Sequence, residues 1–300
     1  MKSDARRRGG IAATLVLAVL AAGPPLRAER VSVRFNLKTY AAPEGDIQAW
    51  LTSYNALWTS YGARYGGTVQ GAFEPPRLGS SWEIEVRFPV FAGLALDLAG
   101  SSVSGAATGQ VRFQDATGNH VETDGLLNDI KAVPLRFGLS FTLPVWNNLR
   151  LTAGIGRHLV FARYRTEESY EALFKTAKED YRYWFKRETT FRSESLGGYW
   201  TLGAEYLVLP FLAVGIDAEK ASSRMSGFKG STTYSDHTGR DESGKTSLYY
   251  FESDEFGADL STVLLAGRTE RPEGELYRNV RAGELDFSGF SLKIGVRFLF

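Results

Sequence analysis

The sequence contains no cysteine, and this absence excludes two kinds of structure. Small secreted domains stapled by disulfides and metal sites ligated by thiolates both require cysteine. After the first 30 residues the chain also lacks any apolar run long enough for a membrane-spanning helix, which needs about 20 apolar residues. A multi-span helical membrane protein is therefore excluded.

An excess of charge of one sign is also missing. There are 35 Lys and Arg against 34 Asp and Glu, for a net charge of +1. Such a balance does not produce the positive electrostatic potential that attracts nucleic acid. No phosphate loop, dinucleotide fingerprint or nucleic-acid module is visible either. The mean hydropathy of −0.20 resembles that of a soluble protein. A globular domain remains, or a membrane protein whose apolar surface is not carried by helices.

The first 28 residues have the three parts of an export signal. A basic start at Lys2 and Arg6 is followed by the apolar stretch from Ile11 to Ala22, and then by helix-breaking residues ahead of Ala28. The apolar stretch is short for a membrane span, which disfavours a retained anchor or a cytoplasmic helix. The sequence predicts a signal peptide over residues 1–28, cleaved after Ala28, and one exported domain over residues 29–300.

Apolar and polar side chains alternate in the last segment of the chain. From Phe290 to Phe298 one face carries Phe, Leu, Ile, Val and Phe, and the other carries Ser, Lys, Gly and Arg. A β-strand turns successive side chains to opposite faces. Seven more segments alternate in this way: Val31–Lys38, Trp82–Phe88, Leu94–Leu98, Val133–Leu143, Leu149–Gly156, Trp200–Val208 and Leu212–Glu219. Eight strands are predicted.

The connections between these segments are short and long in turn. Hairpin-length connections lie at Pro89–Gly93, Pro144–Asn148 and Pro210–Phe211, whereas the others span tens of residues. Short turns at one end and long loops at the other are typical of an up-and-down antiparallel transmembrane β-barrel. A soluble β-sandwich would also alternate, but small residues on the polar faces fit a narrow lumen better than open solvent.

A ten-stranded barrel is an alternative to the eight-stranded one. The segments Ser247–Ser253 and Leu260–Leu265, both in the last long connection, could supply the two further strands.

The polar faces of the eight segments carry seven positive and six negative charges. They are Arg34, Lys38, Arg87, Arg136, Arg150, Lys293 and Arg297, facing Glu83, Glu85, Asp97, Glu205, Asp217 and Glu219. Buried charges are tolerable only when they are paired. The near balance predicts a lumen closed by salt bridges, and a narrow or gated channel for small solutes is the alternative.

Two arginines disturb the pattern. When the alternation of Leu149–Gly156 is continued, Arg157 and Arg163 fall on the lipid-facing side. A lipid-facing arginine is costly unless it reaches the headgroups. Either Arg157 does so, or a β-bulge near Gly156 resets the phase.

The alternating last strand, which ends the sequence on Phe298, Leu299 and Phe300, resembles the terminal signature of bacterial outer-membrane β-barrels. With the export signal and eight strands, the chain is similar to the small barrels of the OmpA, OmpX and OmpW kind, although its loops are longer. The resemblance implies an outer-membrane location with outer-membrane lipid and lipopolysaccharide as neighbours. It also implies periplasmic chaperones as partners, and recognition of Phe298 and Phe300 by the barrel-assembly machinery.

Two long connections carry features of their own. The segment Glu167–Arg187 begins with acids and ends with bases, which favours a helix; a strand extension is the alternative. Its cations interleave with aromatic residues and could contact lipopolysaccharide phosphates: Lys175, Lys178, Arg182, Lys186 and Arg187. The first connection has apolar residues at helical spacing, which predicts a helix that packs as a cap over the barrel mouth: Ile47, Trp50, Leu51, Tyr54, Leu57 and Trp58.

A convergent catalytic site is not evident in the sequence. His120, Glu122 and Asp124 are candidates for a metal cluster, although carboxylates near a lone histidine usually face solvent. His158 falls on the inward face, where it could serve a lipid- or peptide-modifying enzyme together with Ser, Asp or Glu. We predict a non-enzymatic protein, without cofactor or metal, that serves envelope structure or surface interaction.

Overall fold

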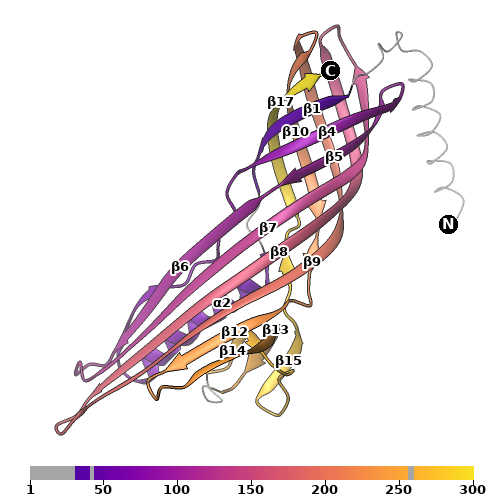
Figure 1. Ribbon diagram of the computed structural model, residues 1–300. Coiled ribbons are helices and arrows are strands. Elements are labelled where there is room, and N and C mark those ends of the chain that lie inside the picture. The colour runs from indigo at the N-terminus through magenta and orange to yellow at the C-terminus, as the bar shows by residue number, and fades with distance from the viewer. Residues whose placement is uncertain (1–30, 41–43, 256–259) are drawn as a thin grey trace, which may run out of the picture.

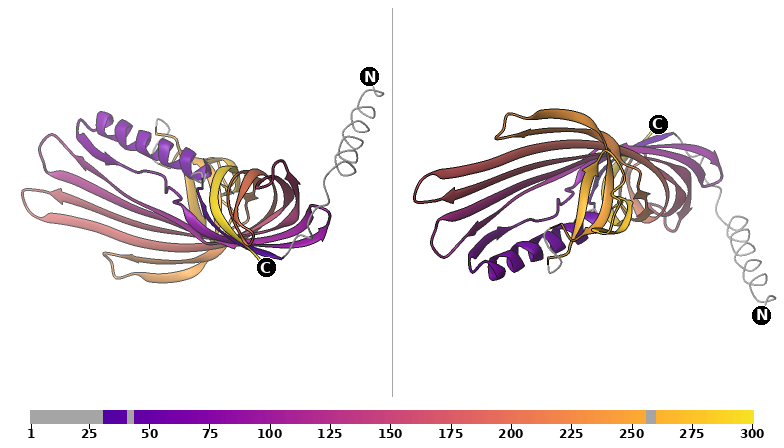
Figure 2. Two further views of the ribbon diagram at one scale, coloured as in Figure 1. Left: turned by 90° about the horizontal axis from the view of Figure 1, so that it is seen from above. Right: turned by 90° about the horizontal axis from the view of Figure 1, so that it is seen from below.

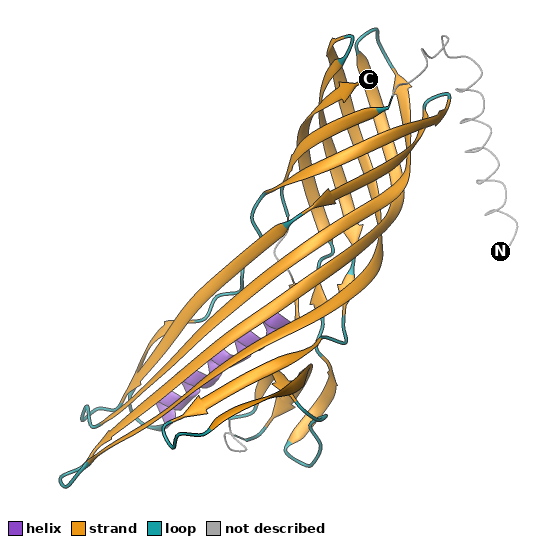
Figure 3. Ribbon diagram, viewed as in Figure 1, coloured by secondary structure: helices purple, strands orange, loops and turns teal. Residues whose placement is uncertain are grey.

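The structure, a computed structural model, describes residues 31–40, 44–255 and 260–300. The predicted signal peptide, residues 1–28, lies outside the described residues. The described part contains one helix, α2 (Asp46–Arg64), and is otherwise built from strands (Figures 1 and 3). No helix in this part of the chain is long and apolar enough to cross a membrane.

Eight strands pair in a closed antiparallel ring. They are β1 (Ser32–Lys38), β4 (Ser81–Phe91), β5 (Leu94–Ser101), β7 (His120–Pro144), β8 (Leu149–Lys175), β9 (Asp180–Leu209), β10 (Leu212–Ser222) and β17 (Gly289–Leu299). Each pairs with the next in this order, and β17 pairs with β1 to close the ring. Apart from Val31, which precedes β1, they contain the eight segments predicted from alternation, so the up-and-down barrel is confirmed.

The outer surface of this ring is apolar. Its exposed side chains include Phe35, Leu37, Ile84, Leu96, Leu98, Leu135, Phe137, Leu139, Leu151, Ile155, Leu202, Val214, Ile216, Leu292, Ile294 and Val296. Exposed aromatic residues lie near the short turns: Phe91, Trp146, Phe211 and Phe300. An apolar band bordered by aromatic residues around a polar interior is the surface of a transmembrane barrel. The chain folds as an integral outer-membrane β-barrel.

Beyond the ring, β7, β8 and β9 continue as one curved sheet (Figures 1 and 2). On the β7 side it is extended by β6 (Val103–Gln114) and β3 (Thr68–Ala72). On the β9 side it is extended by β12 (Lys229–Asp236), β13 (Asp241–Ser253), β14 (Thr262–Arg268) and β15 (Tyr277–Ala282). These strands, with the distal parts of β7, β8 and β9, form the extracellular sheet. A small separate sheet contains β2 (Glu44–Gly45), β11 (Arg224–Met225) and β16 (Leu285–Asp286).

One alternative and one prediction about the long connections are wrong. The segments proposed for a ten-stranded barrel do fall largely in β13 and β14, but these pair with each other and with β12 and β15, outside the ring. The segment Glu167–Arg187 is not helical, because β8 and β9 pair without interruption to Lys175 and Asp180. Hydrogen bonding to neighbours on both sides outweighs a local preference for helix. The strand extension, the alternative for this segment, is correct.

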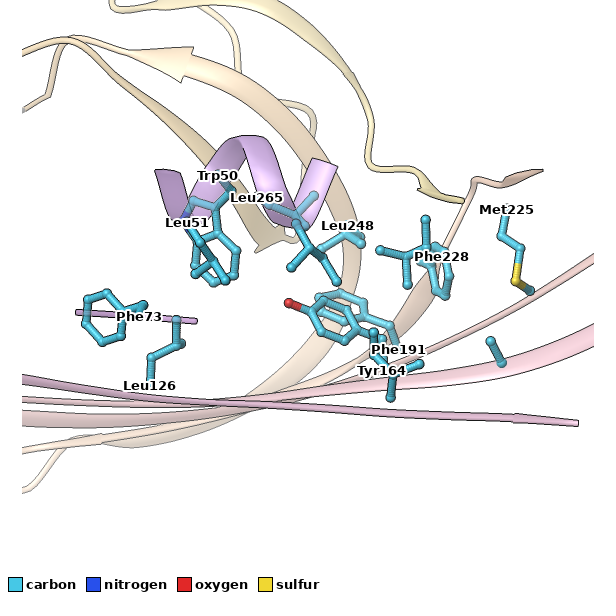
Figure 4. Close-up of a cluster of buried hydrophobic side chains, with 14 of the residues drawn as sticks. Trp50, Leu51, Phe73, Leu126, Tyr164, Phe191, Met225, Phe228, Leu248 and Leu265 are labelled. Carbon is cyan, nitrogen blue, oxygen red and sulfur yellow. The ribbon is translucent and has the colours of Figure 1, made fainter. Parts of the chain in front are cut away.

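Along a single strand, the inward face changes from apolar to polar and the outward face from polar to apolar. On β7, the inward Leu126 and Ile130 are buried apolar residues, whereas the inward Arg136 and Thr142 lie within the ring. On the outward side, Lys131 is exposed to water and Phe137 belongs to the apolar band. The exchange occurs near Ala132. The apolar core of the protein therefore lies in the extracellular sheet, and not inside the barrel (Figure 4).

Candidate functional site: a cavity beneath helix α2

Helix α2 closes the open side of the extracellular sheet (Figure 2). The side-chain amide of Asn55 donates to the Phe73 carbonyl and accepts from the Phe73 N–H, both at 2.9 Å, directly after β3. On the other side, the Ser53 hydroxyl accepts from the N–H of Val263 in β14 at 2.9 Å. β3 and β14 are the two edges of the sheet, and exposed edges leave backbone groups unpaired. The helix therefore satisfies groups at both edges.

The start of α2 is fixed by an acidic residue. The Asp46 carboxylate accepts hydrogen bonds from both terminal nitrogens of Arg281, one at 2.7 Å, and from the Glu284 N–H at 2.7 Å. Gly45, just before the helix, has φ 98°, a conformation that favours glycine. The helix is thus anchored to β15 and to the segment that follows it.

A cavity of about 500 Å³ lies between α2 and the sheet. We call it the α2 cavity. It is lined by Trp50, Tyr54, Leu57, Trp58 and Tyr61 of the helix, by Glu122, Leu126, Thr166, Glu168, Tyr170, Tyr183, Phe185, Arg187, Thr189 and Phe191 of β7, β8 and β9, by Glu255, and by Leu264, Leu265, Ala266, Gly267 and Arg268 of β14. Small-molecule sites typically measure about 300–1,000 Å³ and combine aromatic walls with a few polar groups. Its size and lining suit a small organic ligand.

Two carboxylates hold the helix to the sheet through tyrosine hydroxyls. Tyr61 and Tyr170 donate to the two oxygens of Glu122 at 2.6 and 2.7 Å. Tyr54 donates to Asp124 Oδ2 at 2.7 Å. Burial raises the pKa of Tyr54, Tyr61 and Tyr170, so these hydroxyls keep their protons. Both acids are buried in β7, so two turns of α2 are tied to one strand.

Asp124 has an unusual pKa. Burial, and secondarily the negative charge of Glu168, raise the pKa of the Asp124 carboxyl to about 7, although the hydrogen bond from Tyr54 acts in the opposite direction. Removal from water disfavours the charged form of a carboxyl group. Asp124 therefore changes its charge near neutral pH.

The cations of the cavity wall are paired. Arg187 Nη1 lies 3.3 Å from Glu168 Oε2, and Arg268 Nη2 lies 3.6 Å from Glu255 Oε2. With Glu122, three acids face two bases in the lining. The wall is weakly acidic and mainly aromatic.

The five cations predicted to contact lipopolysaccharide are not gathered into one patch. Lys175 and Lys178 lie at the turn that joins β8 to β9, and this turn is at the far end of the extracellular sheet (Figure 1). Arg182 donates to Glu171 across that hairpin at 2.9 and 3.0 Å. Lys186 is exposed, and Arg187 lines the α2 cavity.

The helix predicted in the first connection is confirmed by α2, but it packs against the extracellular sheet at β3 and β14 and not as a cap over the barrel mouth. Five of its six marked residues are buried, namely Ile47, Trp50, Leu51, Leu57 and Trp58. Tyr170, which lines the cavity from β8, was not singled out from the sequence, and Tyr183 of β9 was noted only as an aromatic residue among the cations of Glu167–Arg187 and not as part of a cavity. Only the strand register brings them opposite the helix, and nothing in their local sequence signals it.

The lumen brings most of the predicted charges together. Glu219 is completely buried and contacts Lys38 at 2.6 Å, Lys293 at 3.0 Å and Arg136. Arg136 and Lys293 also reach Glu83, at 2.6 and 3.6 Å. These three cations and two carboxylates are connected, and Arg136, whose Nη2 lies 3.6 Å from Glu85 Oε2, links them to the next group.

A second group lies nearer the short turns. Arg297 contacts Glu85 at 2.7 Å and Glu205 at 2.9 Å. Arg34 pairs with Asp217 and lies 3.5 Å from Glu205, and Arg87 lies 3.0 Å from Asp97.

Arg150 is the exception among the predicted lumen residues. It is half-buried at the start of β8 and makes no ion pair within the described residues. Its place beside the short turn puts it at the rim of the lumen.

The histidines do not form a metal site in the described part of the chain. His120 Nε2 lies 2.6 Å from Glu122 Oε1, but no three His, Asp or Glu side chains among the described residues could hold a metal ion. His158 faces the lumen as expected and is buried, and neither ring nitrogen has a hydrogen-bond partner there.

The two terminal aromatic residues differ in position. Phe298 is on the outer surface of β17, with its ring edge-on to that of Phe35, 6.3 Å between centroids. Phe300 is exposed, and its N–H donates to the Val31 carbonyl at 3.0 Å. Recognition of both residues by the assembly machinery stays a prediction.

The sequence matches no protein-family model and no curated protein. Among solved structures, the chain is similar to the outer membrane protein OprG from Pseudomonas aeruginosa, with 13% identity, a TM-score of 0.37 and coverage of 91% of this chain and 97% of that chain. It is also similar to the outer membrane protease OmpT from Escherichia coli, with 10% identity, a TM-score of 0.29 and coverage of 91% and 94%.

The raised pKa of Asp124 predicts a pH-dependent stability of the extracellular part. Because the buried carboxyl holds its proton more tightly than in the unfolded chain, its contribution is complete below about pH 4. That contribution is lost as the pH rises through about 7. Hydrogen exchange of the α2 amides should therefore become faster, relative to the intrinsic rate, between pH 4 and 8.

The Asp124→Asn variant provides the control for this prediction. It keeps an acceptor for Tyr54 but does not titrate, so protection of α2 should depend less on pH. An identical pH profile in wild type and variant would contradict the assignment.

Proposed function

We propose that this protein is a closed outer-membrane barrel that carries an extracellular binding site for a small amphipathic molecule. The observation that carries the proposal is the α2 cavity, an aromatic cavity of about 500 Å³ formed by a helix tied to both edges of the extracellular sheet. In this proposal the barrel anchors the protein in the membrane, and the ligand binds in the α2 cavity at the cell surface.

The ion pairs of the lumen support a closed barrel. Arg34, Lys38, Glu83, Glu219, Lys293 and Arg297 are each at most 2% exposed. The void beside Arg87, Asp97 and Arg136 has a volume of about 10 Å³, about the space of one water molecule. Paired charges in so narrow a space leave no path for a hydrated solute, and separating them would leave buried charges uncompensated. A narrow channel is the competing function.

The residues that line the α2 cavity suggest the class of ligand. Aromatic rings from the helix and from β8 and β9 offer stacking and apolar contact, and the acids outnumber the bases by three to two. We infer a preference for a flat apolar body with neutral or cationic polar groups over an anionic one. Binding, and not catalysis, is proposed because Glu122 and Asp124 are already engaged by tyrosine hydroxyls.

The closed lumen predicts electrical silence in planar bilayers. The wild-type barrel should show no discrete conductance steps. Arg136→Ser combined with Glu219→Ser removes one large ion pair without changing the net charge and should open a measurable path. The exposed pair Arg240→Ser with Glu242→Ser is the matched control and should stay silent. Conductance steps in the wild type would contradict the closed barrel.

The α2 cavity predicts selective binding of an apolar amine. N-phenyl-1-naphthylamine and 8-anilino-1-naphthalenesulfonate share an aromatic body, but only the second is anionic. In lipid nanodiscs, with empty discs subtracted, the amine should bind at least about tenfold more tightly, as measured by probe fluorescence; tenfold corresponds to about 1.4 kcal/mol.

Filling the cavity provides the matched test. Ala266→Phe adds a ring at the cavity wall and should abolish binding of the amine. Ala106→Phe adds the same ring at an exposed position of β6 and should leave binding unchanged. Equal binding by both variants would place the probe outside the cavity and refute the proposal.

A further inference from the structure

Arg157 projects from the lipid-facing surface of the barrel. The pairing of β7, β8 and β9 is unbroken around it, with Phe137 and Gly198 opposite Arg157, so the β-bulge considered from the sequence is not formed. Its neighbours on the outer face include the exposed apolar residues Ile155 and Leu196. Among the described residues Arg157, itself exposed, has no hydrogen bond or ion pair.

A charge on the lipid-facing surface is stabilised by an anionic partner or by contact with the headgroup region. An arginine on the lipid face of a barrel costs about 2–4 kcal/mol at the midplane and about 0–1 kcal/mol near the interface. Such residues are retained where they pair with an anion or reach the headgroups. Because the described residues supply no anion to Arg157, the candidate partner is the anionic headgroup of a lipid.

A groove runs along the outer surface beside Arg157. It has a volume of about 550 Å³ and is lined by Ile155, Gly156, Arg157, Gly198, Tyr199, Trp200, Lys220, Ala221 and Ser222. The floor consists of small residues, since Gly198 lies between Arg157 and Ser222 in the register. Lys220 borders the groove on the other side, and its Nζ lies 5.1 Å from the centroid of the Phe290 ring.

The groove lies at the extracellular end of the apolar band. β10 begins beside the short turn at Leu212 and ends at Ser222, two residues after Lys220. Phe290 is likewise the second residue of β17, the strand whose other end reaches the short-turn side. Exposed aromatic residues here, Trp200 and Phe290, occupy the position of an interfacial belt. The two cations therefore face the outer leaflet.

We propose that this groove binds a phosphorylated glycolipid of the outer leaflet, with Arg157 and Lys220 each contacting one of two phosphates on its sugar headgroup. The cations are separated by the width of β9 and offset by two residues, a distance on the order of 10 Å from the spacing of strands. That separation suits two phosphates on one disaccharide better than the single phosphate of a glycerophospholipid. The Trp200 ring offers a surface for the sugar, and the acyl chains lie along the apolar band.

The proposal is tested by counting bound lipid. Full-length protein is purified in detergent, incubated with diphosphorylated lipid A, and measured by native mass spectrometry, with phosphatidylglycerol and inorganic phosphate in parallel. The wild type should retain one lipid A, should bind phosphatidylglycerol at least tenfold more weakly, and should not lose lipid A to inorganic phosphate. Arg157→Gln with Lys220→Gln should weaken the retention of lipid A at least tenfold.

A second variant separates loss of the site from loss of the fold. A Cβ atom at Gly198 would meet only the Gly156 carbonyl, at 3.8 Å, so Gly198→Leu should fold, as judged by the heat-dependent gel shift, and still exclude the headgroup. The control Arg240→Gln with Lys245→Gln removes two exposed extracellular cations and should bind as the wild type does. Unchanged lipid A binding in both groove variants would overturn the proposal, as would equal affinity for phosphatidylglycerol or displacement by inorganic phosphate.

Discussion

The structure depends on the need to pair every backbone polar group within the membrane. The acyl chains of the bilayer core offer no hydrogen bonds, so the eight membrane strands must close into a ring. Three of them, β7, β8 and β9, continue well beyond it while they remain paired to each other. Their side chains alternate throughout, so the same inward face serves first the lumen and then the extracellular core. The exchange of polarity near Ala132 follows from this continuity, because lipid surrounds only one part of the strands.

The two parts are stabilised by different forces. In the ring, apolar side chains face lipid and charged side chains are buried with partners, as Glu219 is with Lys38 and Lys293. In the extracellular sheet, hydrophobic burial is dominant, with Phe113, Tyr164 and Phe228 completely buried. Helix α2 is needed only there, since a sheet open at β3 and β14 would expose that core to water. The α2 cavity is the space that the helix and the sheet leave between them.

Alternation alone was sufficient to predict the membrane strands, because lipid and lumen impose opposite polarities on neighbouring residues. It also indicated the lumen charges, with Arg150 as the exception at the rim. It did not identify the strand from Glu167 to Tyr170. The inward residues there, Glu168 and Tyr170, are polar like their neighbours, so apolar and polar residues do not alternate and the segment was predicted as a helix. The spacing of Trp50, Leu57 and Trp58 predicted α2, but not its partners. Tyr170 and Phe185 line the α2 cavity only because of a register that extends over the whole length of β8 and β9.

The exchange of polarity can be measured directly on β7. Because the chain has no cysteine, a single introduced thiol carries a spin label at one known position. Asp129→Cys, Lys131→Cys, Leu135→Cys and Phe137→Cys sample the outward face on both sides of Ala132. In lipid nanodiscs, labels at 129 and 131 should be more accessible to a water-soluble nickel complex, and labels at 135 and 137 to oxygen dissolved in the bilayer. The same accessibility at all four positions would contradict a membrane boundary near Ala132 and, with it, the division into barrel and extracellular binding site.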